Sequence, residues 1–107
     1  MKEHRYGVTL TYLETADGEK PEVEPISFEV LNHDDIFRII GLMNESKILP
    51  PEDAKAFVVG LKLFTDVVMK HRDEPLFAAM KPYIGDIMKT LKGELKARGV
   101  VKKPEAK

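Results

Sequence analysis

Two short segments with alternating side chains constrain the fold of this chain more than any other feature. Residues 4–13 and residues 26–31 place an apolar side chain at every second position. This period of two, in segments rich in aromatic and β-branched residues, is typical of strands with one buried face. The dipeptide Asp17-Gly18 between them favours a turn. The sequence therefore predicts an N-terminal antiparallel β-hairpin.

The register of the hairpin follows from the requirement that the apolar side chains share one face. That requirement places Tyr6 opposite Val30, and the same register then places His4 opposite Asn32. The polar residues that end the second strand are therefore expected beside the start of the first strand.

Helical periodicity begins after the second strand. Asn32 is expected as the N-cap of a first helix that runs to about Asn44, because its side chain can accept a hydrogen bond from a free amide of the first turn. Pro50 and Pro51 indicate the start of a second helix. This helix should end near Arg72, because cations suit the negative end of the helix dipole.

A third helix is expected from Pro82, as its first residue, to Gly99, which favours a C-terminal stop. Residues 1–99 are predicted to form a single α+β domain, and residues 100–107 a flexible C-terminal tail. The predicted order of elements is ββααα. Because an isolated two-stranded hairpin is marginal in water, we expect its apolar face to pack on the three helices in a two-layer arrangement.

The same periodicities predict the core. Apolar residues at every second position of the strands, or at three- and four-residue spacing in the helices, are expected to be buried. They are Tyr6, Val8, Leu10, Phe28, Val30, Phe37, Ile40, Phe57, Leu61, Phe64, Ile84, Ile87 and Leu91.

Length and composition place the chain among small cytoplasmic proteins. A chain of 107 residues has the size of one domain and can bury a core without a metal or cross-links. It has no cysteine, which excludes disulfides, thiolate metal sites and cysteine nucleophiles and fits a reducing compartment. Its apolar runs are far shorter than the roughly 20 residues that span a bilayer. We therefore expect a soluble cytoplasmic protein without a membrane partner.

The net charge of −1 conceals an uneven distribution, since residues 14–35 are mainly acidic and residues 89–107 mainly basic. In the last helix, Lys89, Lys92 and Lys96 are expected on the face opposite the apolar stripe. A basic helix face can bind nucleic acid. Lysine-rich outer faces are common on soluble helices, however, so we do not expect nucleic acid as the main partner.

A cluster of polar residues gives the strongest candidate for a ligand site. The expected register brings His4 close to Asn32, His33, Asp34 and Asp35, a set that we call the polar corner. Two imidazoles, an amide and two carboxylates could bind a divalent metal, or an anion at a helix N-terminus. Their spacing matches no metal-binding motif, and capping explains the amide and both carboxylates. A structural role is the expectation and ligand binding is the alternative; we predict no metal, cofactor or catalytic residue.

Four blocks of this sequence resemble a family of short bacterial proteins. They are His4-Arg5-Tyr6, Phe28-Glu29-Val30-x-Asn32-His33-Asp34-Asp35-Ile36-Phe37, Gly60-Leu61-Lys62-Leu63-Phe64 and Pro75-Leu76-Phe77. The family is one of the numbered families of unknown function, and the resemblance runs from about residue 3 to residue 93. It implies a bacterial origin and this hairpin-plus-helices fold. It implies no activity, cofactor or catalytic residue.

Three hypotheses for the function remain, and we favour the first. The first is a non-enzymatic interaction module of the bacterial cytoplasm, which forms a homodimer through the uncharged edge of the first strand and can also have an unidentified protein partner. The second is a small-molecule or metal-binding protein, which could extend to an enzyme, using the polar corner. The third is a nucleic-acid accessory protein using the basic last helix.

Overall fold

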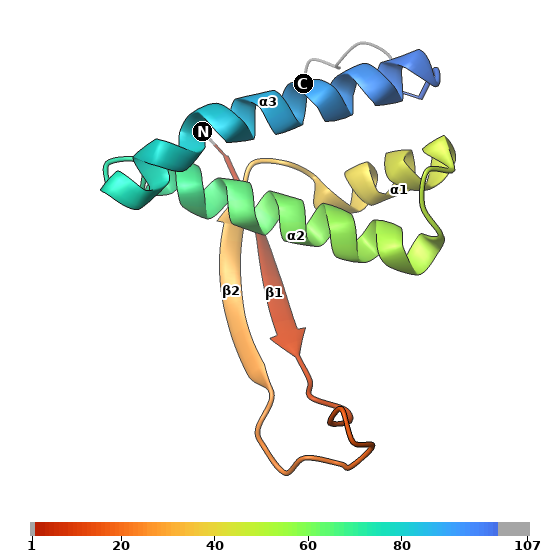
Figure 1. Cartoon of the computed structure of the whole chain (residues 1–107), viewed down its shortest axis with the longest axis vertical. Coiled ribbons are helices and arrows are strands. Elements are labelled where there is room, and N and C mark those ends of the chain that lie inside the picture. The colour runs from red at the N-terminus through yellow and green to blue at the C-terminus, as the bar shows by residue number, and fades with distance from the viewer. Residues whose placement is uncertain (1, 101–107) are drawn as a thin grey trace. The chain divides into compact units, whose positions relative to one another are not determined.

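A computed structural model describes residues 2–100 and confirms the predicted α+β fold with the order ββααα (Figure 1). The elements are β1 (His4–Leu10), β2 (Ile26–Asn32), α1 (Ile36–Ser46), α2 (Pro51–Lys70) and α3 (Pro75–Ala97). The chain divides into two compact units, the hairpin unit up to Asp34 and the helical unit from Asp35. Residues 101–107 of the predicted tail lie outside the described residues. The packing of the hairpin on the helices stays a prediction.

The hairpin adopts the predicted antiparallel register, in which Tyr6 lies opposite Val30. β1 ends at Leu10, earlier than the predicted residue 13. The reason is that the register would next pair Thr11 with Pro25, which has no amide hydrogen to donate to a ladder. The proline therefore sets the length of the paired strands.

The loop between the strands contains the predicted turn. Gly18 has a φ of 87°, a left-handed conformation that glycine adopts without steric cost. Its amide donates a hydrogen bond to the carbonyl of Thr15 (2.9 Å), and the amide of Glu19 donates to the Thr15 hydroxyl (3.0 Å). These bonds order the end of the loop. We call the connecting segment, residues 11–25, the hairpin tip.

The prediction that Asn32 caps the first helix is wrong. Asn32 is the last residue of β2, and α1 begins at Ile36 with Asp35 as its N-cap. The Oδ1 atom of Asp35 accepts a hydrogen bond from the amide of Arg38 (3.1 Å). Because strand pairing extends as far as Asn32, that residue stays extended and a later aspartate caps the helix.

α2 starts where the sequence predicts, whereas α3 begins earlier than predicted. α3 starts at Pro75 and continues through Pro82, which lies inside the helix instead of at its start. A proline at this position lacks the amide that would donate to the carbonyl of Ala78. Residues 76–81 include leucine, two alanines, methionine and lysine, all good helix formers. The helix is therefore established before the proline is reached.

Gly99 ends α3, as predicted. It has a φ of 75°, and its amide donates to the carbonyl of Lys96 (3.0 Å). The amide of Val100 donates to the carbonyl of Leu95 (3.1 Å), which completes a Schellman motif. Val100 and Leu95 are both buried. The sequence predicts a flexible tail from residue 100, yet Val100 is bonded and buried at the end of the helix.

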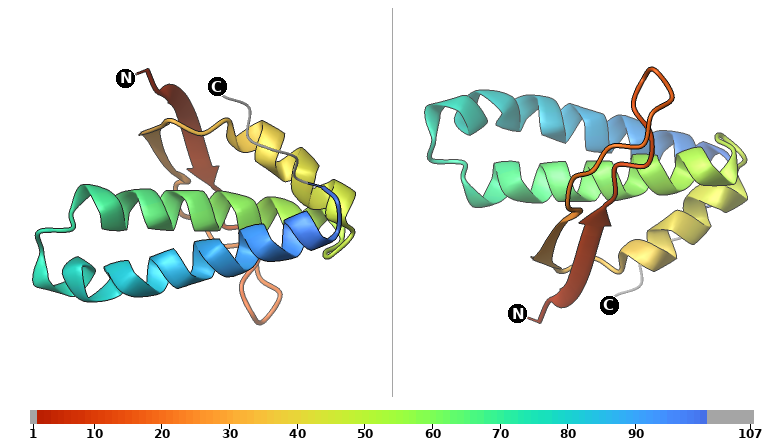
Figure 2. Two further views of the ribbon diagram at one scale, coloured as in Figure 1. Left: turned by 90° about the horizontal axis from the view of Figure 1, so that it is seen from above. Right: turned by 90° about the horizontal axis from the view of Figure 1, so that it is seen from below.

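Within the helical unit, α1 packs against α2 and α2 lies beside α3 (Figure 2). The ends of α1 and α3 are joined by a hydrogen bond from Arg98 Nη1 to the carbonyl of Ser46 (3.2 Å). Ser46 is buried, and its hydroxyl donates to the carbonyl of Met43 (2.6 Å) and accepts from the amide of Ile48 (3.2 Å). These contacts fix the turn between α1 and α2.

The core differs from the predicted one. Its buried apolar side chains are Ile36, Met43, Ala54, Val58, Val68, Ile84, Leu95 and Val100. Of the predicted core residues, only Ile84 is buried. Those that are exposed are Leu10, Phe28, Phe37, Phe57, Phe64 and Ile87. Those that are half-buried are Tyr6, Val8, Val30, Ile40, Leu61 and Leu91.

The wrong prediction of which α2 side chains are buried has a simple physical cause. This helix has apolar residues on more than one face, so a helical period does not by itself show which face is buried. The sequence pattern predicts burial of the stripe that contains Phe57 and Phe64, but the structure buries the adjacent stripe, which contains Ala54 and Val58. Phe57 and Phe64 are 39% and 46% exposed, so α2 has a second apolar face that is less buried than the first.

Ile84 and Ile87 give a matched test of this core, because the same residue type on one helix is 6% exposed at the first position and 43% at the second. Ile84→Ala should lower the free energy of unfolding by about 2–5 kcal/mol, the usual cost of truncating a buried isoleucine. Ile87→Ala should cost less than about 1 kcal/mol. Urea unfolding followed by circular dichroism measures both. Equal losses would show that α3 packs through a different face.

Candidate functional site

Four of the five residues of the polar corner belong to the hairpin unit. The register places His4 opposite Asn32, as predicted. His33 and Asp34 follow directly in the chain, whereas Asp35 begins the helical unit. The structure therefore brings His4 beside the end of β2, whereas Asp35 belongs to the helical unit.

Hydrogen bonds within the hairpin unit engage the side chain of Asn32 and the backbone of Asp34. Asn32 is 3% exposed, and its Oδ1 atom accepts from the amide of Asp34 (2.9 Å). The hydroxyl of Tyr6 donates to the carbonyl of Asp34 (2.7 Å). The second bond joins β1 to the segment that follows β2. These groups therefore stabilise the turn by which the chain leaves the sheet.

The two histidines of the polar corner are exposed. The ring of His4 lies 6.1 Å from the ring of Tyr6, measured between centroids. The Nε2 atom of His33 lies 3.5 Å from Oδ1 of Asp34, and the His33 side chain is 63% exposed. An ion pair with this exposure contributes little stability. Within residues 2–100, no group of three or more His, Cys, Asp or Glu side chains is arranged to hold a metal ion.

Asp35 has a structural role of its own, because its carboxylate caps α1. The side chains of Asn32 and Asp35 thus have partners that explain their presence, whereas Asp34 contributes its backbone amide and carbonyl. Ligand binding at the polar corner is not tested by these contacts and stays a prediction.

The cap predicts the effect of two substitutions at one position. Asp35→Ala should lower the free energy of unfolding by about 0.5–2 kcal/mol, because it removes the acceptor for the amide of Arg38. Asp35→Asn should cost no more than a few tenths of a kcal/mol, because asparagine caps helices about as well as aspartate. Chemical denaturation of both variants measures the difference, and an equal loss for both would mean that the negative charge, not the cap, is what α1 requires.

Divalent metal gives a separate test of the polar corner. Because the side chains of Asn32 and Asp35 are engaged in the fold and no three ligands are grouped within residues 2–100, micromolar zinc or manganese should leave the melting temperature unchanged. The measurement is differential scanning fluorimetry on the wild type and on His4→Gln. A metal-dependent rise in the wild type that disappears in His4→Gln would establish a metal site here.

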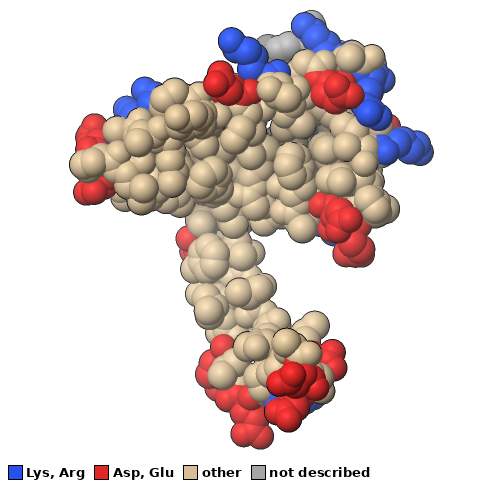
Figure 3. Space-filling view, in the orientation of Figure 1, with Lys and Arg blue, Asp and Glu red and all other residues tan. Residues whose placement is uncertain are grey.

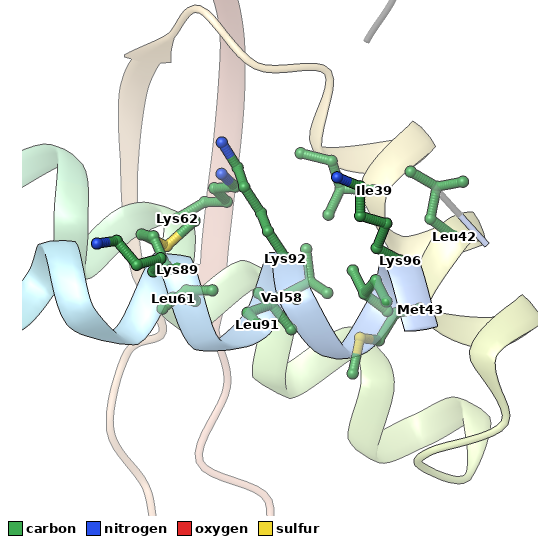
Figure 4. Close-up of a pocket in the computed structure, with 13 residues that line it drawn as sticks. Ile39, Leu42, Met43, Val58, Leu61, Lys62, Lys89, Leu91, Lys92 and Lys96 are labelled. Carbon is green, nitrogen blue, oxygen red and sulfur yellow. The ribbon is translucent and has the colours of Figure 1, made fainter. Parts of the chain in front are cut away.

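The helical unit carries a groove that the sequence analysis missed. Its volume is about 780 Å³, and residues of all three helices line it (Figure 4). The apolar lining includes Ile39 and Leu42 from α1, Val58 and Leu61 from α2, and Leu91 from α3. A groove of this size and apolar character lies within the range of binding sites in proteins.

Lysines line the same groove. Lys89, Lys92 and Lys96 of α3 and Lys62 of α2 stand among its apolar residues (Figure 4), and we call the whole site the lysine groove. Lys89, Lys92 and Lys96 are exposed, whereas Leu91 is half-buried and Leu95 is buried, so the lysines lie on a different side of α3 from the apolar stripe. Their long side chains nevertheless line the groove. On a helix, residues three and four positions apart are neighbours, so lysines at this spacing form one edge beside the stripe.

The spacing of these lysines was visible in the sequence, but it could not indicate a groove. The other wall and the floor come from α1 and α2, which lie far from α3 in the sequence. Only the packing of the three helices brings the lysines of α3 beside the apolar residues of α1.

Comparison with known proteins agrees with the fold and the expected resemblance. Residues 4–93 match the family described as a domain of unknown function with a solved structure, DUF3861. This chain belongs to the DUF3861 family. The expected resemblance to a numbered family of unknown function is thereby confirmed.

A solved structure gives a second comparison for this DUF3861 protein. It is the crystal structure of a protein of unknown function from Pectobacterium atrosepticum, with 31% sequence identity and a TM-score of 0.74. The match covers 85% of this chain and 98% of that chain. Among curated proteins, no match was found. Membership of DUF3861 therefore supports the fold and adds no activity, so the function must be argued from the surfaces of this chain.

Proposed function

We propose that this DUF3861 protein is a non-enzymatic interaction module of the bacterial cytoplasm that forms a homodimer through the free edge of β1. The observation that carries the proposal is the hairpin itself. Within the described residues the sheet has two strands, so the outer edge of each strand is without a strand neighbour. An open strand edge is a template for pairing with a second chain unless it is blocked.

The two edges differ in how well they are protected. β1 carries Arg5 near its start, 3.9 Å from Glu29 of β2, but has no charged residue from Tyr6 to its end at Leu10. β2 follows Pro25 and carries Glu29, and both features discourage pairing at its edge. β1 is therefore the edge better suited to pair with its copy. Pairing about a two-fold axis would give a continuous four-stranded antiparallel sheet.

Exposed apolar residues on the hairpin also support self-association. On one face of the sheet, Leu10, Ile26 and Phe28 are 64%, 60% and 44% exposed. Soluble monomers rarely expose large continuous apolar patches without a binding role. A four-stranded sheet would join the apolar faces of two hairpins into one surface, which could then be covered as a unit.

The other two hypotheses have weaker support. Two side chains of the polar corner, Asn32 and Asp35, already bond within the turn after β2 and at the cap of α1. The lysines of α3 border an apolar groove, whereas nucleic acid is bound mainly through its phosphates on open basic surfaces. An unidentified protein partner is compatible with the proposal.

The cellular setting rests on three observations. The sequence contains no cysteine, which suits the reducing cytoplasm. A similar protein comes from the bacterium Pectobacterium atrosepticum, which supports a bacterial origin. None of the helices within residues 2–100 is long and apolar enough to cross a membrane.

A substitution that introduces a positive charge on β1 tests whether the dimer forms through this strand. Thr9→Lys should weaken dimerisation at least about tenfold, or about 1.4 kcal/mol, because it places a strongly hydrated ammonium group at the paired edge. Sedimentation equilibrium at about 100 μM detects even a dimer with a dissociation constant of about 10 μM. The wild type should sediment as a dimer under these conditions.

Ser27→Lys is the matched control. Ser27 lies opposite Thr9, and the two hydroxyl oxygens are 3.0 Å apart, so each substitution removes the same cross-strand contact. Only Thr9→Lys puts the charge on β1. Ser27→Lys should dimerise like the wild type. A wild type that remains monomeric at about 100 μM would end the dimer hypothesis.

A further inference from the structure

The lysine groove has the features of a docking site for an acidic and apolar segment. The side chains of Lys89, Lys92 and Lys96 are exposed, and within residues 2–100 none of them is paired with a carboxylate. They border a lining that, apart from Lys62 of α2, has no charged residue and is partly open to water. Complementary charge at the rim of an apolar contact favours association and selects the partner.

The hairpin tip offers the complementary surface. It contains five acidic residues and one basic residue: Glu14, Asp17, Glu19, Glu22, Glu24 and Lys20. Figure 3 shows acidic side chains gathered over this end of the hairpin. The tip also has large exposed apolar side chains, since Tyr12, Leu13 and Val23 are 54%, 75% and 61% exposed. Acidic and apolar groups thus occur together, as the lysine groove requires.

The proposed dimer would carry each tip towards the helices of the other copy. Two β1 strands that pair about a two-fold axis run antiparallel, so the Leu10 end of one strand lies near the His4 end of its partner. The chain leads from that end of the hairpin into the helical unit, because Asp35 follows β2 by three residues. The hairpin tip has seven residues on each side of Gly18, and seven extended residues span up to about 23 Å, at about 3.3 Å per residue.

We propose that the hairpin tip of each copy docks in the lysine groove of the other copy. The inference rests on the proposed dimer and adds a second interface to it. The carboxylates of Glu14, Glu22 and Glu24 would meet the lysines of α3, while Tyr12 and Leu13 cover the apolar lining. The contact occurs twice in each dimer, related by the two-fold axis, so that both grooves are filled and the assembly closes.

A charge exchange tests this contact. One variant, with the groove reversed, carries Lys89→Glu, Lys92→Glu and Lys96→Glu; the other, with the tip reversed, carries Glu14→Lys, Glu22→Lys and Glu24→Lys. Each variant alone should dimerise at least about tenfold more weakly than the wild type, because every tip then meets a groove of its own sign. An equimolar mixture should recover association, because every tip then meets a groove of opposite sign. Sedimentation velocity on the separate and mixed variants gives the result.

Single substitutions separate a specific contact from an effect of net charge. Lys92→Glu and Lys81→Glu change the charge of α3 equally, and both side chains are exposed, but only Lys92 lines the groove. Lys92→Glu should weaken the dimer and Lys81→Glu should leave it unchanged. Circular dichroism confirms that every variant is folded, so a lost dimer is not the result of unfolding.

The outcomes distinguish this contact from pairing at the β1 edge. If Thr9→Lys weakens the dimer but both charge-reversed variants dimerise like the wild type, the groove contact is overturned and the edge pairing stands. If the mixture recovers association while Thr9→Lys has no effect, the groove contact stands and the edge pairing is overturned. A mixture that stays monomeric when the wild type is dimeric also overturns the groove contact.

Discussion

In the helical unit, a hydrogen bond from Arg98 to the carbonyl of Ser46 joins the ends of α1 and α3, and these two residues are 52 positions apart in the sequence. The guanidinium group of Arg98 is held by Glu94, one turn earlier on α3, at 2.9 Å. The Ser46 hydroxyl in turn bonds to groups on both sides of the turn after α1. Because α1 and α3 provide opposite walls of the lysine groove, this connection holds the groove at one end.

Much of the hairpin could be predicted because its information is local. The two-residue period, the Asp17-Gly18 turn and the matching of apolar faces fix the register, and the structure confirms it. The core was predicted poorly, because the apolar residues of α2 occupy two faces and only tertiary packing selects Val58 over Phe57. The start of α3 was predicted wrongly at Pro82, because proline favours the first position of a helix. Here the good helix formers before Pro82 extend the helix back to Pro75.

The candidate sites show the same division between local and distant information. The polar corner was found because its residues are linked by one strand register, but the sequence could not show that Asn32 serves a turn and Asp35 serves the cap. The lysine groove was missed because three separate helices build it. The spacing of Lys89, Lys92 and Lys96 indicates a basic stripe on α3. The sequence pattern is the same, however, whether such a stripe faces open water or borders an apolar groove.

Pro82 has a consequence for the motions of α3. An amide at that position would link two successive turns, and without it the first two turns of the helix, from Pro75 to Lys81, are coupled to the rest by fewer backbone bonds. Local opening of a helix proceeds through such weak junctions. The segment before Pro82 can therefore fray as a unit while the remainder of α3, which carries the lysines and ends in the Schellman motif, keeps its shape. Hydrogen exchange along α3 would then show two blocks of protection with a boundary at the proline.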